Sequence, residues 1–147
     1  MIELNSILDL DAMSGAVLMI DDSADDADLA RLAFEQAGLE QEFLVLTDPV
    51  EAVHELAESP QLREHVRMIL LDFNMPRMNG LDVLRVLRDD PHFATLPVVI
   101  MSTSDEPMER VASAALRVDG HFQKPADFSD FVQLAGDIKA KYLASSN

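Results

Sequence analysis

The sequence predicts an α/β fold in which helices cover both faces of a five-stranded parallel sheet. Short apolar runs of three to five residues alternate with longer segments whose apolar residues recur every three or four positions. Continuous apolar runs of this length suit strands that are buried on both faces. Strict alternation of strands and helices is typical of a parallel sheet, because each crossover helix packs back onto the sheet.

The expected strands are short and strongly apolar. They cover residues 16–20, 42–46, 68–71, 98–101 and, with a weaker pattern, 121–123. The first of them, AVLMI, is apolar throughout and ends abruptly at Asp21 and Asp22. Three of the others also end beside polar residues.

The expected helices follow these strands and carry ordinary start and stop signals. They cover residues 25–37, 49–58, 81–88, 107–117 and 127–143. Asp48 followed by Pro49 is a good helix start, since the carboxylate caps the first turn and proline suits the first helical position. Gly38 is a typical C-cap residue, and Pro91 ends the third helix.

The length of 147 residues favours a single domain. We expect this domain to cover residues 15–143, with an N-terminal extension at 1–14 and a frayed C-terminus at 144–147. Because no room is left for an output domain after residue 143, we expect a stand-alone protein.

Composition and charge exclude several classes of function. The chain has no cysteine, so disulfides, thiolate metal sites and cysteine nucleophiles are excluded. Its formal net charge of −16 argues against nucleic acid or an anionic membrane as a direct partner. No apolar run approaches the roughly 20 residues that span a bilayer, and the N-terminus lacks the basic region of a signal peptide. We therefore expect a cytoplasmic protein.

Polar residues follow four of the five expected strands. Asp21 and Asp22 follow the first strand, Asp72 the third, Ser102 the fourth and Lys124 the fifth. Ligands of open parallel sheets bind beyond the carboxyl ends of the strands, so we expect these side chains to meet at one edge. Three close carboxylates repel one another unless a cation offsets their charge, and Mg²⁺ prefers oxygen ligands of this kind.

This set of groups suits phosphoryl transfer to a carboxylate. An aspartate oxygen can attack phosphorus and form an aspartyl-phosphate. A metal ion, a lysine and a hydroxyl would then stabilise the charge on the transferring group. The pattern therefore predicts Asp72 as a phosphoryl acceptor.

Each of these residues also has a purely structural interpretation. Ser23 with Asp26 has the spacing of a capping box, with Asp in place of Glu. Ser102 and Thr103 suit N-cap positions of the fourth helix. An isolated aspartate or lysine after a strand is most often a solvated residue. The functional interpretation rests on the coincidence of polar residues at four separate strand ends.

The same segments resemble the receiver domain of response regulators, a CheY-like family. The matching parts are the acidic pair after AVLMI and the segments LDFNMPRMNG, PVVIMSTS and FQKP. The resemblance covers residues 16–143, nearly the whole chain. It implies a doubly wound (βα)5 flavodoxin-like fold with strand order 2-1-3-4-5.

The resemblance implies a Mg²⁺-dependent phosphoacceptor site. Asp72 would be the phosphorylated residue. Asp21 and Asp22 would hold Mg²⁺, with Asp22 the more direct ligand. Asp72 and the backbone carbonyl of Asn74 would complete the protein's share of the metal ligands.

The resemblance also implies residues that respond to the phosphoryl group. Ser102 would be the switch hydroxyl, Lys124 would pair with a phosphate oxygen, and the Lys124–Pro125 peptide bond would be cis. His121 occupies the position of a mobile aromatic switch residue, usually Tyr or Phe, so the sequence departs from the family here. Asn79 replaces the usual Asp of the preceding turn, where Asn-Gly supplies the same turn chemistry.

A narrower resemblance indicates the partners. The segments DDSADDADLARLAFEQAGL and PADFSDF, the Pro-Arg of NMPRMNG and the STS triplet resemble stand-alone receivers that partner bacterial phytochrome-type histidine kinases. This implies a sensor histidine kinase, a bacteriophytochrome in particular, as the phosphoryl donor. It also implies a homodimer through the fourth helix, fifth strand and fifth helix. Tyr142, near the end of the fifth helix, is either a dimer contact or a core residue.

Two other classes of protein stay open from the sequence. A haloacid-dehalogenase-like phosphatase also uses an aspartate nucleophile with Mg²⁺, but it needs an Asp-x-Asp pair, and the first strand here ends in adjacent aspartates. A binding module that has lost phosphorylation would lack some of the expected polar positions, and all five are present. We expect a signalling protein that catalyses only its own phosphorylation and slow dephosphorylation.

Overall fold

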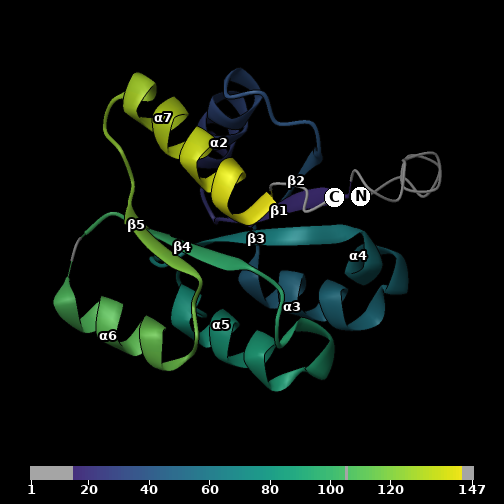
Figure 1. Ribbon diagram of the computed structural model, residues 1–147. Coiled ribbons are helices and arrows are strands. Elements are labelled where there is room, and N and C mark those ends of the chain that lie inside the picture. The colour runs from purple at the N-terminus through teal and green to yellow at the C-terminus, as the bar shows by residue number, and fades with distance from the viewer. Residues whose placement is uncertain (1–14, 105, 144–147) are drawn as a thin grey trace.

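Five parallel strands form one sheet in the order β2-β1-β3-β4-β5 (Figure 1). They are β1 (Ala16–Ile20), β2 (Glu42–Leu46), β3 (Val66–Asp72), β4 (Val98–Ser102) and β5 (Gly120–Gln123). The structure is a computed structural model that describes residues 15–104 and 106–143. The expected fold class and strand order are confirmed. The extension at 1–14 and the frayed end at 144–147 lie outside the described residues.

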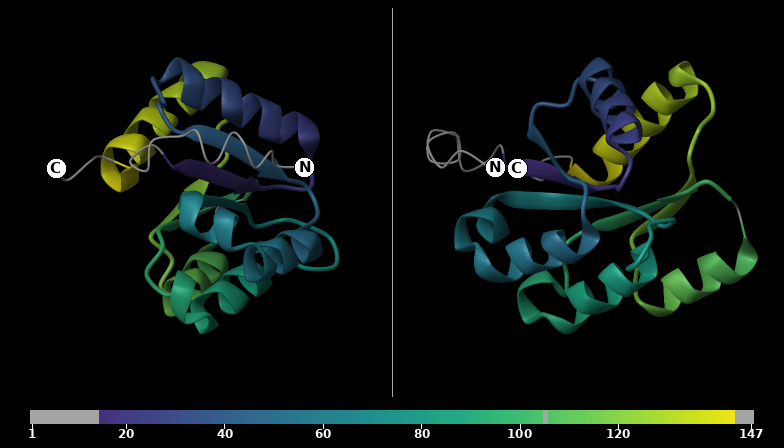
Figure 2. Two further views of the ribbon diagram at one scale, coloured as in Figure 1. Left: turned by 90° about the vertical axis from the view of Figure 1, so that its right-hand side faces the viewer. Right: turned by 180° about the vertical axis from the view of Figure 1, so that it is seen from behind.

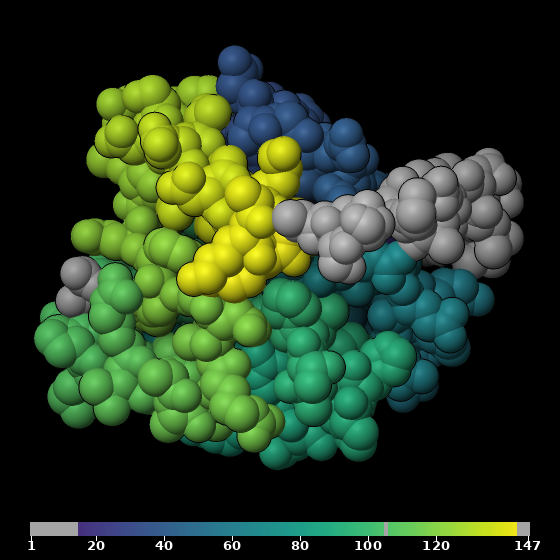
Figure 3. All heavy atoms as spheres, viewed as in Figure 1, coloured from purple at the N-terminus to yellow at the C-terminus, as the bar shows by residue number. Residues whose placement is uncertain are grey.

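Helices cover both faces of the sheet (Figures 1 and 2). The α-helices are α2 (Ala24–Gln36), α3 (Pro49–Glu58), α4 (Pro60–His65), α5 (Gly80–Asp89), α6 (Pro107–Ala115) and α7 (Phe128–Ile138). A 3-10 turn, η1 (Pro91–Phe93), follows α5, and a π-helical turn, η2 (Lys139–Leu143), continues α7. Helices α2 and α7 lie on one face, and α3, α4, α5 and α6 lie on the other. On the left side of Figure 3, α7, β5 and α6 follow one another from top to bottom.

The central strands feed two separate cores, because successive side chains of a strand point to opposite faces. In β1, Val17 and Met19 pack with α2 and α7. Leu18 and Ile20 of the same strand pack with α3, α4 and α5. Both faces are therefore apolar along the whole strand, which explains the continuous apolar runs in the sequence.

The structure differs from the expected elements in three places. Helix α4 was not expected; Ser59 caps it and Pro60 starts it directly after α3. The edge strands β2 and β5 are only partly buried, because each has a neighbouring strand on one side alone. The last helix changes to π-helical geometry at Lys139, where a single helix to residue 143 was expected.

Two further expectations are settled by the described residues. Tyr142 packs on the α2–α7 core and its hydroxyl donates to the Asp119 carbonyl at 2.7 Å, so it belongs to the domain body. The Lys124–Pro125 peptide bond is trans, so the expected cis bond is wrong. Trans is the form that most peptide bonds before proline adopt. Within residues 15–104 and 106–143, no helix is long and apolar enough to cross a membrane.

Candidate functional site

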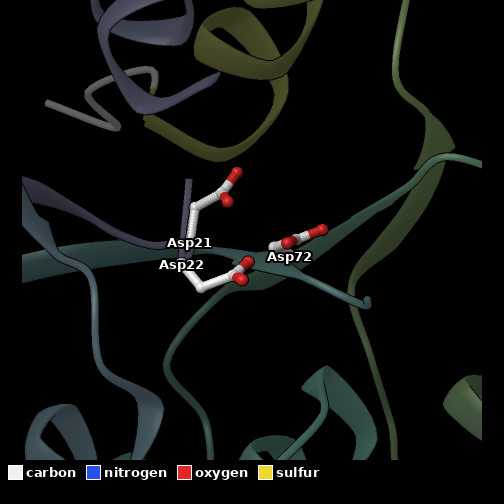
Figure 4. Close-up of side chains that lie close together, drawn as sticks. All are labelled: Asp21, Asp22 and Asp72. Carbon is white, nitrogen blue, oxygen red and sulfur yellow. The ribbon is translucent and has the colours of Figure 1, made fainter. Parts of the chain in front are cut away.

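Three carboxylates converge at the carboxyl ends of the two central strands (Figure 4). Asp21 and Asp22 directly follow β1, and Asp72 is the last residue of β3. One oxygen from each lies within 4.8 Å of the others. Asp21 and Asp72 are buried, whereas Asp22 is exposed and opens the cluster to solvent. The sheet thus brings together the three acids that the sequence analysis placed there.

Lys124 reaches into this cluster from the end of β5. Its backbone N–H donates to the Ser102 carbonyl at 2.7 Å, which extends the β4–β5 pairing by one residue. Its ammonium group lies 3.1 Å from Asp21, 3.0 Å from Asp26 and 3.2 Å from Asp72. One cation therefore faces three carboxylates, which lie just after β1, in α2 and at the end of β3.

Burial and mutual repulsion dominate the electrostatics of Asp72. Burial raises the pKa of Asp72 from 3.8 to about 7, and the neighbouring Asp21 adds to this rise. Lys124 and the Asn74 N–H act in the opposite direction. Burial lowers the pKa of Lys124, but the three carboxylates outweigh that effect and raise it above its usual value of 10.5. The ammonium thus stays charged and only partly offsets the acids.

The donor set fits a hard divalent cation. All three converging groups are carboxylates, the ligands that Mg²⁺ and Mn²⁺ favour over nitrogen or sulfur. Burial, with the charge of Asp21 adding to it, raises the pKa of Asp72, so the ionised carboxylate is disfavoured at this site. A cation bound by Asp21, Asp22 and Asp72 would remove that cost.

Ser102 lies beside this cluster as the last residue of β4 and is fully buried. Its hydroxyl donates to Glu109 Oε1 of α6 at 2.8 Å, with the Asn74 side-chain oxygen at 3.3 Å. The alternative that Ser102 and Thr103 cap the fourth helix is wrong, because the N-cap of α6 is Glu106. Ser102 therefore links the strand end to the first turn of α6.

Asn74 joins the loop after β3 to the loop after β4. Its side-chain oxygen accepts hydrogen bonds from the Thr103 N–H at 3.1 Å and the Thr103 hydroxyl at 3.0 Å. Its own N–H donates to Asp72 Oδ1 at 3.3 Å. The expected role of Asn74 was limited to its backbone carbonyl as a metal ligand, and that role stays a prediction.

His121 lies in β5 opposite Ile100. Both ring nitrogens are buried, and the ring meets Phe73 edge-on with centroids 6.3 Å apart. Phe73 directly follows Asp72, so the His121 ring lies against the first residue after β3, next to the proposed phosphoryl acceptor. Its role as a switch residue stays a prediction.

Sequence patterns missed two residues of this site. Asp26 was assigned to a capping box, and Ser23 does accept a hydrogen bond from the Asp26 N–H at 3.2 Å. The Asp26 carboxylate, however, turns to Lys124, while the Ser23 N–H donates to Asp21. Glu109 gave no signal, because a glutamate in a first helical turn is commonplace.

The sequence is similar to that of known response regulators. The family model described as the response regulator receiver domain matches residues 17–135. Response regulator Rcp1 of Synechocystis sp. is 26% identical over 129 residues, which cover 86% of this chain and 88% of Rcp1.

Solved structures show the same fold. The crystal structure of the phosphorylated cyanobacterial phytochrome response regulator RcpA superposes with a TM-score of 0.80 at 26% identity, over 90% of this chain and 96% of that chain. The Mn(2+)-bound form of Rcp1 superposes with a TM-score of 0.78 at 24% identity, over 90% of this chain and 97% of that chain.

Proposed function

Because the chain belongs to the response regulator receiver domain family, we propose that Asp72 accepts a phosphoryl group from a sensor histidine kinase. The observation that carries this proposal is the convergence of Asp21, Asp22 and Asp72 with Lys124 at one edge of the sheet. The protein is then a signalling component of a two-component system, and its only catalysis acts on its own phosphorylation state.

In the proposed reaction, a carboxylate oxygen of Asp72 attacks phosphorus. The new O–P bond forms as the P–N bond of the kinase phosphohistidine breaks, and the electron pair leaves with the imidazole. Ionised Asp72 is the reactive form, so a cation near it favours the reaction by lowering its raised pKa. Lys124 would exchange carboxylate contacts for a contact with a phosphoryl oxygen.

Mg²⁺ is the cation we propose for the site. Held by Asp21, Asp22, Asp72 and the Asn74 carbonyl, it would offset negative charge on the carboxylates and on the phosphoryl oxygens. The carboxylates of the chain provide the binding, and Lys124 holds Asp21 and Asp72 in place by its ion pairs.

The output of the switch is proposed to lie on α6, β5 and α7. Ser102 and His121 connect the phosphoryl site to α6 and β5, and both would move when the phosphoryl group arrives. Met108 and Val111 of α6 are 81% and 70% exposed, and apolar groups at this exposure suit a docking surface. A second copy of the chain is the partner we propose for this face.

The proposed kinase partner is a bacteriophytochrome, and the proposed compartment is the cytoplasm. RcpA, a cyanobacterial phytochrome response regulator, is similar to 90% of this chain, which supports the kinase class. Residues 15–143 are proposed to form the receiver domain, a range that includes the family match at 17–135.

Incubation with acetyl phosphate and Mg²⁺ tests the proposed function. Wild-type protein should gain one acid-stable, alkali-labile phosphoryl group, and Asp72→Ala should gain none. Equal incorporation by both proteins would contradict the proposal. Rapid multiple turnover of small phosphate esters would instead favour a haloacid-dehalogenase-like phosphatase.

A further inference from the structure

One carboxylate of α6 holds two hydroxyl groups beside the phosphoryl site. Ser102 Oγ donates to Glu109 Oε1 at 2.8 Å, and Ser104 Oγ donates to Glu109 Oε2 at 3.0 Å. Both distances lie within the range of O–H···O hydrogen bonds, and a carboxylate acceptor makes such bonds stronger than bonds between neutral groups. Each carboxylate oxygen thus has its own hydroxyl partner.

The hydrogen bond between Ser102 and Glu109 connects the end of β4 to the start of α6. Ser102 ends β4, and Glu109 lies in the first turn of α6. Glu106, the N-cap residue of α6, makes no side-chain capping bond. The Glu109 carboxylate therefore ties the start of α6 to the strand end by side-chain bonds that ordinary capping does not provide there.

A serine hydroxyl has a single hydrogen to donate. In the present arrangement Ser102 uses that hydrogen for Glu109, with Asn74 as a longer second acceptor. If Ser102 is to donate to a phosphoryl oxygen on Asp72, the bond to Glu109 must break. A phosphoryl group also brings nearly two negative charges, which repel the Glu109 carboxylate.

Building on the function proposed above, we propose that Glu109 is a latch that holds Ser102 and the start of α6 in the resting arrangement. Phosphorylation of Asp72 and the latch compete for the same hydroxyl hydrogen. The energy of the latch therefore opposes phosphorylation, and its release frees the first turn of α6. Glu109 is a positioning residue, since it acts through Ser102 and not on the phosphoryl group.

The affinity for a phosphoryl analogue tests this latch. Beryllium fluoride with Mg²⁺ forms a tetrahedral adduct with a carboxylate, and its binding is measured at equilibrium by calorimetry and ¹⁹F NMR. Glu109→Ala should bind the analogue roughly tenfold more tightly than wild type, which corresponds to about 1.4 kcal/mol. Glu109→Gln keeps the size of the side chain and should shift the affinity in the same direction by less. A gain in affinity does not arise from a damaged fold.

Two controls separate the latch from simple charge repulsion. Glu106→Ala removes an equal charge from an exposed side chain at the start of α6 and should leave the affinity near the wild-type value. In a Ser102→Ala background the latch has lost its main partner, so Glu109→Ala should have little further effect. An equal gain in the two backgrounds would show charge repulsion alone and overturn the latch.

The outcomes also separate the latch from the function on which it rests. If wild type binds the analogue through Asp72 but Glu109→Ala and Glu109→Gln bind no more tightly, the latch is wrong and the proposed function stands. If Asp72→Ala binds the analogue as well as wild type does, both are wrong.

Discussion

The ammonium group of Lys124 lies 3.0 Å from the carboxylate of Asp26, in the first turn of α2. Lys124 also contacts Asp21 and Asp72, so this one side chain joins β5 to α2, β1 and β3. An incoming phosphoryl oxygen has to compete with carboxylates already bound to Lys124. The stability of the resting site and its reactivity therefore depend on the same cation.

Removal of this cation should destabilise the metal-free protein. Lys124→Ala leaves the buried Asp21 and Asp72 without their ammonium partner, and unsatisfied buried acceptors cost about 1–3 kcal/mol. Urea unfolding at pH 8 with EDTA measures the loss. Mg²⁺ should restore part of it, because the metal takes over the charge compensation. Lys139→Ala, the control, should change stability by less than about 0.5 kcal/mol; equal losses in the two variants would contradict the account.

Asp72 should make stability depend on pH with a definite sign. Burial, with Asp21 adding to it, raises the pKa of Asp72 from 3.8 to about 7, so the folded state holds its proton more tightly than the unfolded state does. The stabilising contribution of this group is complete below the unfolded pKa. It is lost as the pH rises from about 4 to about 7, and it stays lost at higher pH.

Asp72→Asn cannot ionise and should remove this dependence. Above pH 7 and without Mg²⁺, the free energy of unfolding of Asp72→Asn should exceed that of wild type by at least about 1.4 kcal/mol, which corresponds to a shift of one pKa unit. The advantage should shrink towards pH 4. Urea unfolding across this range measures it, with Asp137→Asn on the exposed side of α7 as the control. Parallel curves for wild type and Asp72→Asn would show that Asp72 titrates normally.

Gly80 should be intolerant of a side chain although it begins a helix. A Cβ at this position would lie 2.6 Å from the Asp72 carbonyl oxygen and 2.8 Å from the Phe73 Cα. Gly80→Ala should therefore displace the phosphoryl-acceptor loop, lower stability by about 1–3 kcal/mol and slow phosphorylation. Gly136→Ala in α7 meets its nearest atom, Ala37 Cβ, only at 4.0 Å. That variant should gain about 0.5–1 kcal/mol, and similar thermal shifts for both would refute the close approach.

Arg88 should be the most costly charge to remove away from the site. Its guanidinium is buried, and it donates to Asp119 and to four backbone carbonyls that follow α5 and α6. The carbonyl partners belong to Phe93, Leu96, Leu116 and Arg117. Arg88→Ala should cost about 1–3 kcal/mol in urea unfolding, because it leaves the four carbonyls without their buried donor. Asp119 is 37% exposed and still accepts a hydrogen bond from the Val98 N–H. Arg85 is exposed, and its ion pair with Asp82 spans 3.5 Å. Arg85→Ala should therefore lower the free energy of unfolding by less than about 1 kcal/mol.

The strands and the core of the site were predictable because they depend on local patterns. Buried parallel strands have to be apolar on both faces, so β1 and β4 stand out in the sequence as continuous runs. The rule that ligands gather beyond the carboxyl ends of strands then placed Asp72 and its neighbours at one edge. The resemblance to receiver domains added the strand order, which alternation alone does not give.

The missed features depend on contacts between distant segments. The direction of the Asp26 and Glu109 carboxylates is set by how α2 and α6 dock on the sheet, and no periodicity in the sequence reports that. Helix α4 is too short to show a repeating pattern, although Ser59 and Pro60 form a recognisable start. Tyr142 was hard to place because its partner, the Asp119 carbonyl, lies in a distant turn.

The location of the phosphoryl group is the most direct test of the central claim. Wild-type protein treated with acetyl phosphate and Mg²⁺ is digested at acidic pH, and tandem mass spectrometry identifies the modified residue. We expect a single phosphoryl group on Asp72, its loss when EDTA replaces Mg²⁺, and none in Asp72→Asn. A phosphoryl group on another residue, or the same yield on Asp72 without a divalent cation, would contradict this account of the site.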